Sequence, residues 1–117
     1  MAVGSAPGGT AGASTSCKPE AGAVVRTLRL NGSPHQRVRA HVGDTIKVIA
    51  HMKGYRMGVP KPVSHKRAVC RFREHRVSKE KVIAKYRAQR ARKVTFASSA
   101  IKDGHASLIV GYANIKP

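Results

Sequence analysis

The hexapeptide TIKVIA, residues 45–50, is the most hydrophobic of the strand-like runs in this sequence. Its β-branched and apolar residues favour a β-strand, and its hydrophobicity places that strand in the core. Gly43 and Asp44 stand directly before it and predict a turn. We therefore expect this run to be the central strand of the fold, and we interpret the flanking segments relative to it.

Further strand-like segments lie on both sides of this run, and those before residue 74 mix basic with apolar residues as half-buried strands do. They cover residues 23–30, 36–41, 67–73, 94–96 and 106–110. The sequence NGSP at 31–34 and the sequence KDG at 102–104 predict tight turns between them. Residues 53–66 hold two Gly and two Pro and predict a long basic loop.

The segment KEKVIAKYRAQRARK, residues 79–93, favours a helix. Ser78 is a suitable N-cap, and Val82, Ile83 and Tyr86 share one helical face. The fold class predicted is therefore mainly β: a small five-stranded barrel with one inserted basic helix at about 78–93 and a flexible N-terminal tail. Residues 1–19 are the Gly/Ala/Ser-rich tail, and residues 20–117 form the barrel domain.

The charge of the chain is strongly unbalanced. It carries 23 Lys and Arg against 5 Asp and Glu, a formal charge of +18 on 117 residues. Such an excess repels itself, so we expect a polyanionic partner, with nucleic acid as the first candidate.

Several function classes find no support in the sequence. The few acids lie far apart, and neither a phosphate-binding Gly-rich loop nor a nucleophile elbow is present, so we predict no enzyme and no cofactor. The scattered His and Cys predict no metal site. Cys17 and Cys70 belong to no CxxC pair, so we expect no disulfide framework and a reducing compartment. No apolar run is long enough to span a membrane.

Residues 20–50, EAGAVVRTLRLNGSPHQRVRAHVGDTIKVIA, resemble the universal large-subunit ribosomal protein L-fourteen family. The resemblance follows the ordered series of a Gly-Ala step, an Asn-Gly-Ser turn, a basic strand, a Val-Gly-Asp turn and an Ile-Lys-Val strand. It continues through the basic loop and the strand RAVCR at 67–71, and again at 103–106 (DGHA). The longer segment 74–97 and the early C-terminus depart from the family pattern.

The resemblance implies a structural constituent of the large ribosomal subunit that binds rRNA near the subunit interface. Its partners would be large-subunit rRNA, neighbouring ribosomal proteins and, through an intersubunit bridge, small-subunit rRNA. The departures from the family pattern imply a mitochondrial ribosome, with a cytoplasmic or other organellar ribosome as the alternative location. The alternative function is a free-standing nucleic-acid-binding barrel, such as a nucleoid protein or RNA chaperone, although the few aromatic residues count against a single-strand binder.

The RNA-binding residues are predicted among the cations of the strands, the basic loop and the helix, which would contact phosphates by charge-assisted hydrogen bonds. They are Arg37, Arg39, Lys47, Lys53, Arg56, Lys61, Lys66, Arg67, Arg71, Arg73, Lys85, Arg87, Arg90 and Arg92.

Overall fold

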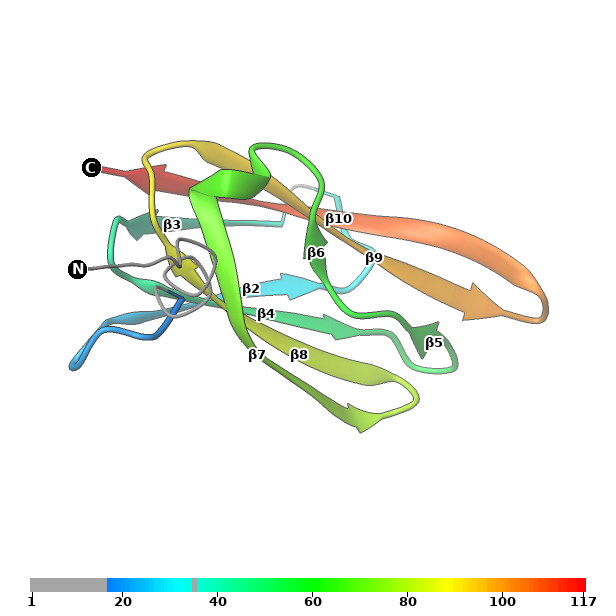
Figure 1. The fold of residues 1–117 in the computed structure, drawn as a ribbon. Helices are drawn as coiled ribbons and strands as arrows, with labels where there is room; N and C mark the ends of the chain where they lie inside the picture. The colour runs from blue at the N-terminus through cyan, green and yellow to red at the C-terminus, as the bar shows by residue number, and fades with distance from the viewer. Residues whose placement is uncertain (1–16, 35) are drawn as a thin grey trace, which may run out of the picture.

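Two β-sheets face each other in the computed structural model, which describes residues 17–34 and 36–117 (Figure 1). The first sheet has the order β2-β4-β8-β7, with the bounds β2 Val25–Leu30, β4 Thr45–His51, β8 Lys81–Ala88 and β7 Val69–Ser78. The second has the order β3-β10-β9-β5, with the bounds β3 Arg37–His41, β10 His105–Lys116, β9 Lys93–Lys102 and β5 Arg56–Met57. The short strand β6 (Lys61–Pro62) also pairs with β9, and a 3-10 turn, η1 (Lys66–Ala68), precedes β7.

The run TIKVIA forms β4 and lies in the interior of the first sheet, as predicted. It pairs in parallel with β2 and antiparallel with β8. Ile46, Val48 and Ala50 are fully buried, whereas Lys47 between them is partly exposed. The turn before β4 is also confirmed: Gly43 has a φ of 97°, a left-handed conformation that Gly adopts without steric cost.

The core fills the space between the sheets. Tyr86 from β8 and Phe96 from β9 meet there with their ring centroids 4.9 Å apart. The Tyr86 hydroxyl donates a hydrogen bond to the Pro60 carbonyl oxygen at 2.5 Å, which joins β8 to the segment between β5 and β6. Leu30 on β2 packs so close to Gly111 on β10 that a Cβ at Gly111 would lie 2.6 Å from a Leu30 methyl carbon.

The predicted basic helix at about 78–93 is wrong. Residues 69–88 form the antiparallel hairpin of β7 and β8, and the residues that the structure describes contain no α-helix. Burial alternates along β8, with Val82, Ala84, Tyr86 and Ala88 inside. A period of two suits a strand, and pairing with β4 outweighs the helix propensity of Ala, Lys and Arg in this segment.

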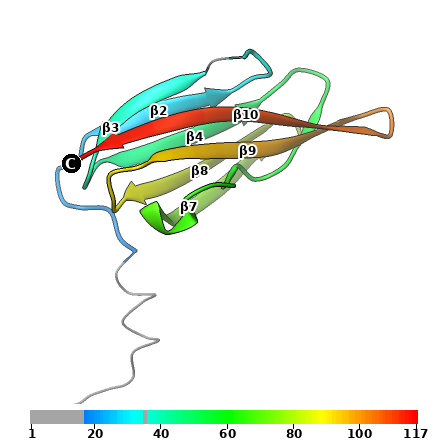
Figure 2. The ribbon, with the colours of Figure 1, turned by 90° about the horizontal axis from the view of Figure 1, so that it is seen from above.

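The predicted closed five-stranded barrel is also wrong, although the mainly β class is confirmed. The first sheet curves as a half-barrel, and the second sheet covers it as the other layer of a sandwich (Figures 1 and 2). Two parallel pairings, β2 with β4 and β3 with β10, place β2 and β3 in different sheets. A closed barrel of sequential hairpins does not form because these pairings join segments that are distant in the chain.

The last two strands are longer than the predicted segments 94–96 and 106–110. Strands β9 and β10 form an extended hairpin whose turn holds Asp103 at φ 51° and Gly104 at φ 77°. Positive φ at both central residues is typical of a type I′ turn, so the predicted turn is confirmed. The predicted loop 53–66 contains the short strands β5 and β6.

A disulfide joins Cys17 to Cys70 on β7, so the expectation of no disulfide is wrong. The two Cα atoms lie 5.7 Å apart, within the usual range for a bridged pair. The bridge fixes the end of the predicted tail to the first sheet; residues 1–16 of that tail lie outside the described residues. In the part of the chain that the structure describes, no helix has the length and apolar character needed to cross a bilayer.

Candidate functional site

Three loops gather at one end of the sandwich. They are residues 52–55 between β4 and β5, residues 79–80 between β7 and β8, and residues 103–104 between β9 and β10. Figures 1 and 2 place these turns at the end opposite the C-terminus. We call these three loops the loop end. Loops on a rigid scaffold are the usual position of binding residues, so this end is the candidate site.

Hydrogen bonds connect the first two loops directly. The Gly54 N–H donates to the Glu80 carboxylate at 2.6 Å, and the Met52 N–H donates to the Glu80 carbonyl oxygen at 3.3 Å. The Met57 N–H donates to the Lys79 carbonyl oxygen at 2.9 Å. Gly54 has a φ of 85°, which turns its N–H toward the other loop at little steric cost. The two loops therefore form one unit.

Arg76 on β7 strengthens this connection from below. Its guanidinium donates to the Met57 carbonyl oxygen at 2.6 Å. The same group donates to the carbonyl oxygens of Ser78 at 3.1 Å and Lys79 at 3.3 Å. One planar side chain thus fixes the β7–β8 turn against β5, because its donors point in fixed directions.

The β9–β10 hairpin provides the third loop and an apolar surface. The Lys102 ammonium lies 5.3 Å from the centre of the Tyr55 ring, a cation–π contact that links the hairpin to the first loop. Leu108 is 66% exposed and Ile101 is 41% exposed. Both lie on one face of the hairpin, since Ile101 pairs with Ala106, two residues before Leu108. An exposed apolar face of this kind is suited to contact with a partner.

Three carboxylates of the described residues form ion pairs within the fold. Glu20 pairs with Arg87 at 2.7 Å, Asp44 with Arg26 at 3.6 Å, and Glu74 with Arg71 at 3.3 Å. Within residues 17–34 and 36–117, no group of three or more His, Cys, Asp or Glu is placed to hold a metal ion.

The cations predicted to contact RNA do not lie on one face. They fall into several groups, of which two share Lys66. These are Lys66, Arg67, Arg90 and Arg92 around one pocket; Lys61, Lys66 and Arg71 around an adjoining one; Arg37 and Arg39 beside a third; Lys47, Arg73 and Lys85 beside a fourth; Lys53 and Arg56 near the loop end; and Arg87 on β8 in its pair with Glu20. The structure thus brings only small subsets of them together.

Sequence reasoning missed the residues that organise the loop end. Neither Glu80 nor Arg76 is among the site residues predicted from the sequence. The hydrogen bond between Glu80 and Gly54 joins positions 26 residues apart. A hairpin interpretation of residues 69–88 would have placed Glu80 at a turn beside the other loops, because its alternating pattern VIAKYRA was available in the sequence.

Comparison with known proteins gives one informative likeness. The sequence matches no protein-family profile, and no curated protein shows significant similarity to it. The fold is similar to the crystal structure of the cysteine protease inhibitor EhICP2 from Entamoeba histolytica, with a TM-score of 0.56, 10% identity, and coverage of 79% of this chain and 97% of that chain. The solution structure of amebosin matches with a TM-score of 0.44 and 11% identity over 81% of this chain and 100% of that chain.

The resemblance to the ribosomal L-fourteen family is therefore wrong: the fold is similar to that of a cysteine protease inhibitor, and no family profile or curated protein supports the ribosomal family. The predicted ribosomal function is therefore also wrong, and so is its alternative, a nucleic-acid-binding barrel. The predicted partners, rRNA and ribosomal proteins, are wrong for the same reason. The motifs that carried the resemblance, such as Val-Gly-Asp before a strand and Asp-Gly in a hairpin, encode turns that many β-proteins share. The mitochondrial location, inferred from the same resemblance, stays a prediction.

Proposed function

We propose that this protein binds and inhibits a cysteine protease, and that the loop end is the surface that does so. The proposal is supported by the likeness of the fold to a cysteine protease inhibitor, which extends over 97% of that chain. At 10% identity the likeness concerns the fold, so the transfer of function depends on the geometry of the loops in this chain.

The observation that carries the proposal is the hydrogen bond of 2.6 Å between Gly54 and the Glu80 carboxylate. An inhibitor that enters a substrate cleft must keep its shape there, since a flexible loop loses entropy on binding and adapts to the protease as a substrate would. The bond between these loops, together with the contacts of Arg76 below them, holds the loop end in one shape before binding.

The surface beside these loops supplies suitable contacts. Leu108 and Ile101 offer apolar area on the β9–β10 hairpin. Lys53, Lys79 and Lys102 lie in or next to the three loops and outnumber the two acids there, Glu80 and Asp103. A partner with an acidic rim around its cleft fits this charge, and the rate of association should then fall as the salt concentration rises.

Inhibition of this kind needs no chemistry from the inhibitor. The protein acts by occupying the cleft in a one-to-one complex, which agrees with the prediction from the sequence that it is not an enzyme. It differs from a substrate in that the loops stay connected to the sandwich by the hydrogen bonds described above.

The direct test is a titration of the purified chain against papain, a cysteine protease, with a fluorogenic peptide as substrate. We expect loss of peptidase activity that reaches completion near one inhibitor per enzyme, and no effect on trypsin, a serine protease. A circular dichroism spectrum verifies that the chain is folded. A folded chain that leaves papain and a panel of related cysteine proteases fully active at about 100 μM would refute the proposal, since even a complex with a Kd of about 10 μM would then be mostly formed.

Variants locate the surface. Glu80→Gln removes the charge that holds Gly54, and Tyr55→Ala removes the ring under Lys102. We expect each to weaken inhibition by about tenfold, equivalent to about 1.4 kcal/mol. Arg92→Ala, at the other end of the sandwich, is the matched control and should inhibit as well as the parent protein. Equal losses in all three would place the binding surface elsewhere.

A further inference from the structure

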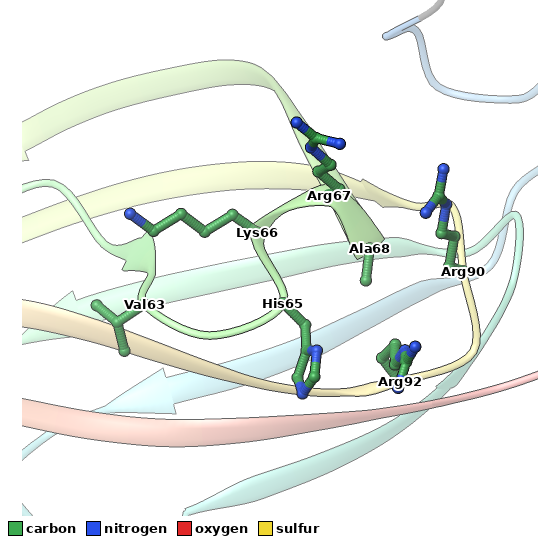
Figure 3. A pocket seen from close by; sticks show the side chains of 7 residues that line it. All are labelled: Val63, His65, Lys66, Arg67, Ala68, Arg90 and Arg92. Carbon is green, nitrogen blue, oxygen red and sulfur yellow. The ribbon is translucent and has the colours of Figure 1, made fainter.

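A second feature of the molecule is a basic pocket far from the loop end. It lies between the segment around η1 and the loop 89–92 that joins β8 to β9, and has a volume of about 480 Å3. Figure 3 shows side chains from both segments disposed around this space. Five of them carry nitrogen bases or cations: His65, Lys66, Arg67, Arg90 and Arg92. The remaining lining residues, Val63 and Ala68, are apolar, so no carboxylate lines the pocket.

The two walls of the pocket are fixed to each other. The Ala68 carbonyl oxygen accepts hydrogen bonds from the N–H groups of Gln89 at 2.8 Å and Arg90 at 3.2 Å. These bonds join segments that lie more than twenty residues apart in the chain. The backbone segments that carry the cations of η1 and of the β8–β9 loop are therefore held together, and the cationic side chains themselves are exposed.

The segment before η1 is fixed as well. The Val63 N–H donates to the Thr95 carbonyl oxygen at 2.8 Å, and the Thr95 N–H donates to the Ser64 hydroxyl at 2.9 Å. His65 then adopts φ 47° and ψ 48°, the left-handed conformation, which costs a non-Gly residue about 1–2 kcal/mol. A strained residue on the rim of a pocket is typical of functional positions.

The positive charges around the pocket are not balanced by acids among the residues that line it. Several like charges surround one space, and Glu20, Asp44, Glu74 and Glu80 are engaged elsewhere. Arg67, Arg90 and Arg92 carry planar guanidinium groups that bind phosphate or sulfate oxygens in pairs. An anion bound among them would relieve their mutual repulsion.

We propose that this pocket binds a small multivalent oxyanion, a molecule that carries two or more phosphate or sulfate groups. The volume is large for a single inorganic phosphate, and the cations come from two walls, so a ligand with several anionic groups meets more of them. The site is at the other end of the sandwich from the loop end and does not depend on protease inhibition.

The test is isothermal titration of the full chain at about 0.15 M salt, where long-range attraction between exposed charges is largely screened. The probes are inorganic tripolyphosphate, a trisulfated heparin disaccharide, and inorganic phosphate alone. We expect saturable one-to-one binding of at least one multivalent probe, at least tenfold tighter than inorganic phosphate. Tighter binding of tripolyphosphate assigns the site to phosphate groups, and tighter binding of the disaccharide assigns it to sulfate groups. Absence of saturable binding for both would overturn the proposal.

Two matched double variants separate a site from general charge. Arg67→Ala with Arg92→Ala removes two cations from this pocket, and Arg37→Ala with Arg39→Ala removes two exposed cations from β3. We expect the first pair to weaken binding by at least 20-fold and the second by less than threefold. Equal losses would show that net charge alone attracts the probe. A short RNA that binds far more tightly than either probe, and whose affinity is unchanged by Arg67→Ala with Arg92→Ala, would also contradict a specific site in this pocket.

Discussion

Replacing Tyr86 by Phe removes one hydroxyl from the centre of the sandwich and leaves the ring in place. The hydroxyl donates to the Pro60 carbonyl oxygen at 2.5 Å, and both residues are buried. The ring itself packs on Phe96, with the centroids 4.9 Å apart. The substitution therefore tests the hydrogen bond that joins the two layers without changing the aromatic packing between them.

The expected loss of stability follows from the burial of the acceptor. The Pro60 carbonyl would stay buried without a partner, and an unsatisfied buried group of this kind costs about 1–3 kcal/mol. For a domain of about 100 ordered residues, each kcal/mol lowers the midpoint of thermal unfolding by about 4–8 °C. We therefore expect Tyr86→Phe to lower the Tm by about 4–24 °C at pH 7.

The same residue gives the stability a dependence on alkaline pH. Burial raises the pKa of Tyr86 above its ordinary value of 10.0, while the neighbouring Arg71 guanidinium acts in the opposite direction. Because the folded state holds the proton more tightly than the unfolded state, this contribution is complete below pH 10 and is lost as the pH rises through the higher folded pKa. Phe has no such proton, so the difference in stability between parent and variant should shrink above pH 10.

Thermal and urea unfolding, followed by circular dichroism from pH 7 to pH 11, measure both effects. Tyr112→Phe is the matched control, since Tyr112 is half-exposed and carries the Lys93 ammonium over its ring rather than a buried hydrogen bond. That control should stay within about 0.5 kcal/mol of the parent. A Tyr86→Phe variant as stable as the control at pH 7, or a difference that stays constant up to pH 11, would refute this account.

Three further changes test the core and the covalent bridge. Ile46→Asp places an unpaired charge at a fully buried position of β4 and should destabilise the fold by more than about 4 kcal/mol; a cooperative urea transition near that of the parent would contradict the position of this strand in the core. Gly111→Ala puts a methyl group 2.6 Å from a Leu30 carbon and should lower the free energy of unfolding by about 1–3 kcal/mol, and an unchanged Tm would show that the layers separate freely there. Replacing both Cys17 and Cys70 by Ser removes the bridge across 53 residues and should lower the free energy of unfolding in urea by about 4 kcal/mol. Dithiothreitol should produce the same loss in the parent protein. A parent protein whose stability does not respond to the reductant would indicate that the bridge does not form.

Local patterns in the sequence predicted local structure well. The hydrophobic run at 45–50 is the buried strand β4, and the Asp-Gly turn at 103–104 closes a hairpin. Residues 81–88 were misjudged because Ala, Lys and Arg have high helix propensity, whereas Val82, Ala84, Tyr86 and Ala88 alternate toward the core. The layer arrangement was beyond such reasoning, since the parallel pairing of β3 with β10 joins residue 37 to residue 112.

The candidate site was harder to predict than the strands. Its shape depends on a carboxylate and a glycine N–H that meet only after the β7–β8 hairpin has packed against the loop between β4 and β5. The disulfide was hard to predict for the same reason. Its two Cys residues are 53 positions apart, and they come together only because the start of the described chain lies beside β7. The excess of cations was visible from the start, but the composition does not specify which of them share a pocket.

The outer part of β10 has a consequence for the behaviour of the protein in concentrated solution. Among the described residues, β10 pairs with β3 only from Tyr112 onward, so the stretch ASLIV at 106–110 presents one edge without a neighbouring strand. Edges of this kind are usually guarded by Lys or Pro against joining the same edge of another copy, and this stretch has neither. Repulsion between molecules of charge +18 protects this edge instead. Because a high salt concentration screens that repulsion, we expect it to cause precipitation through this hairpin.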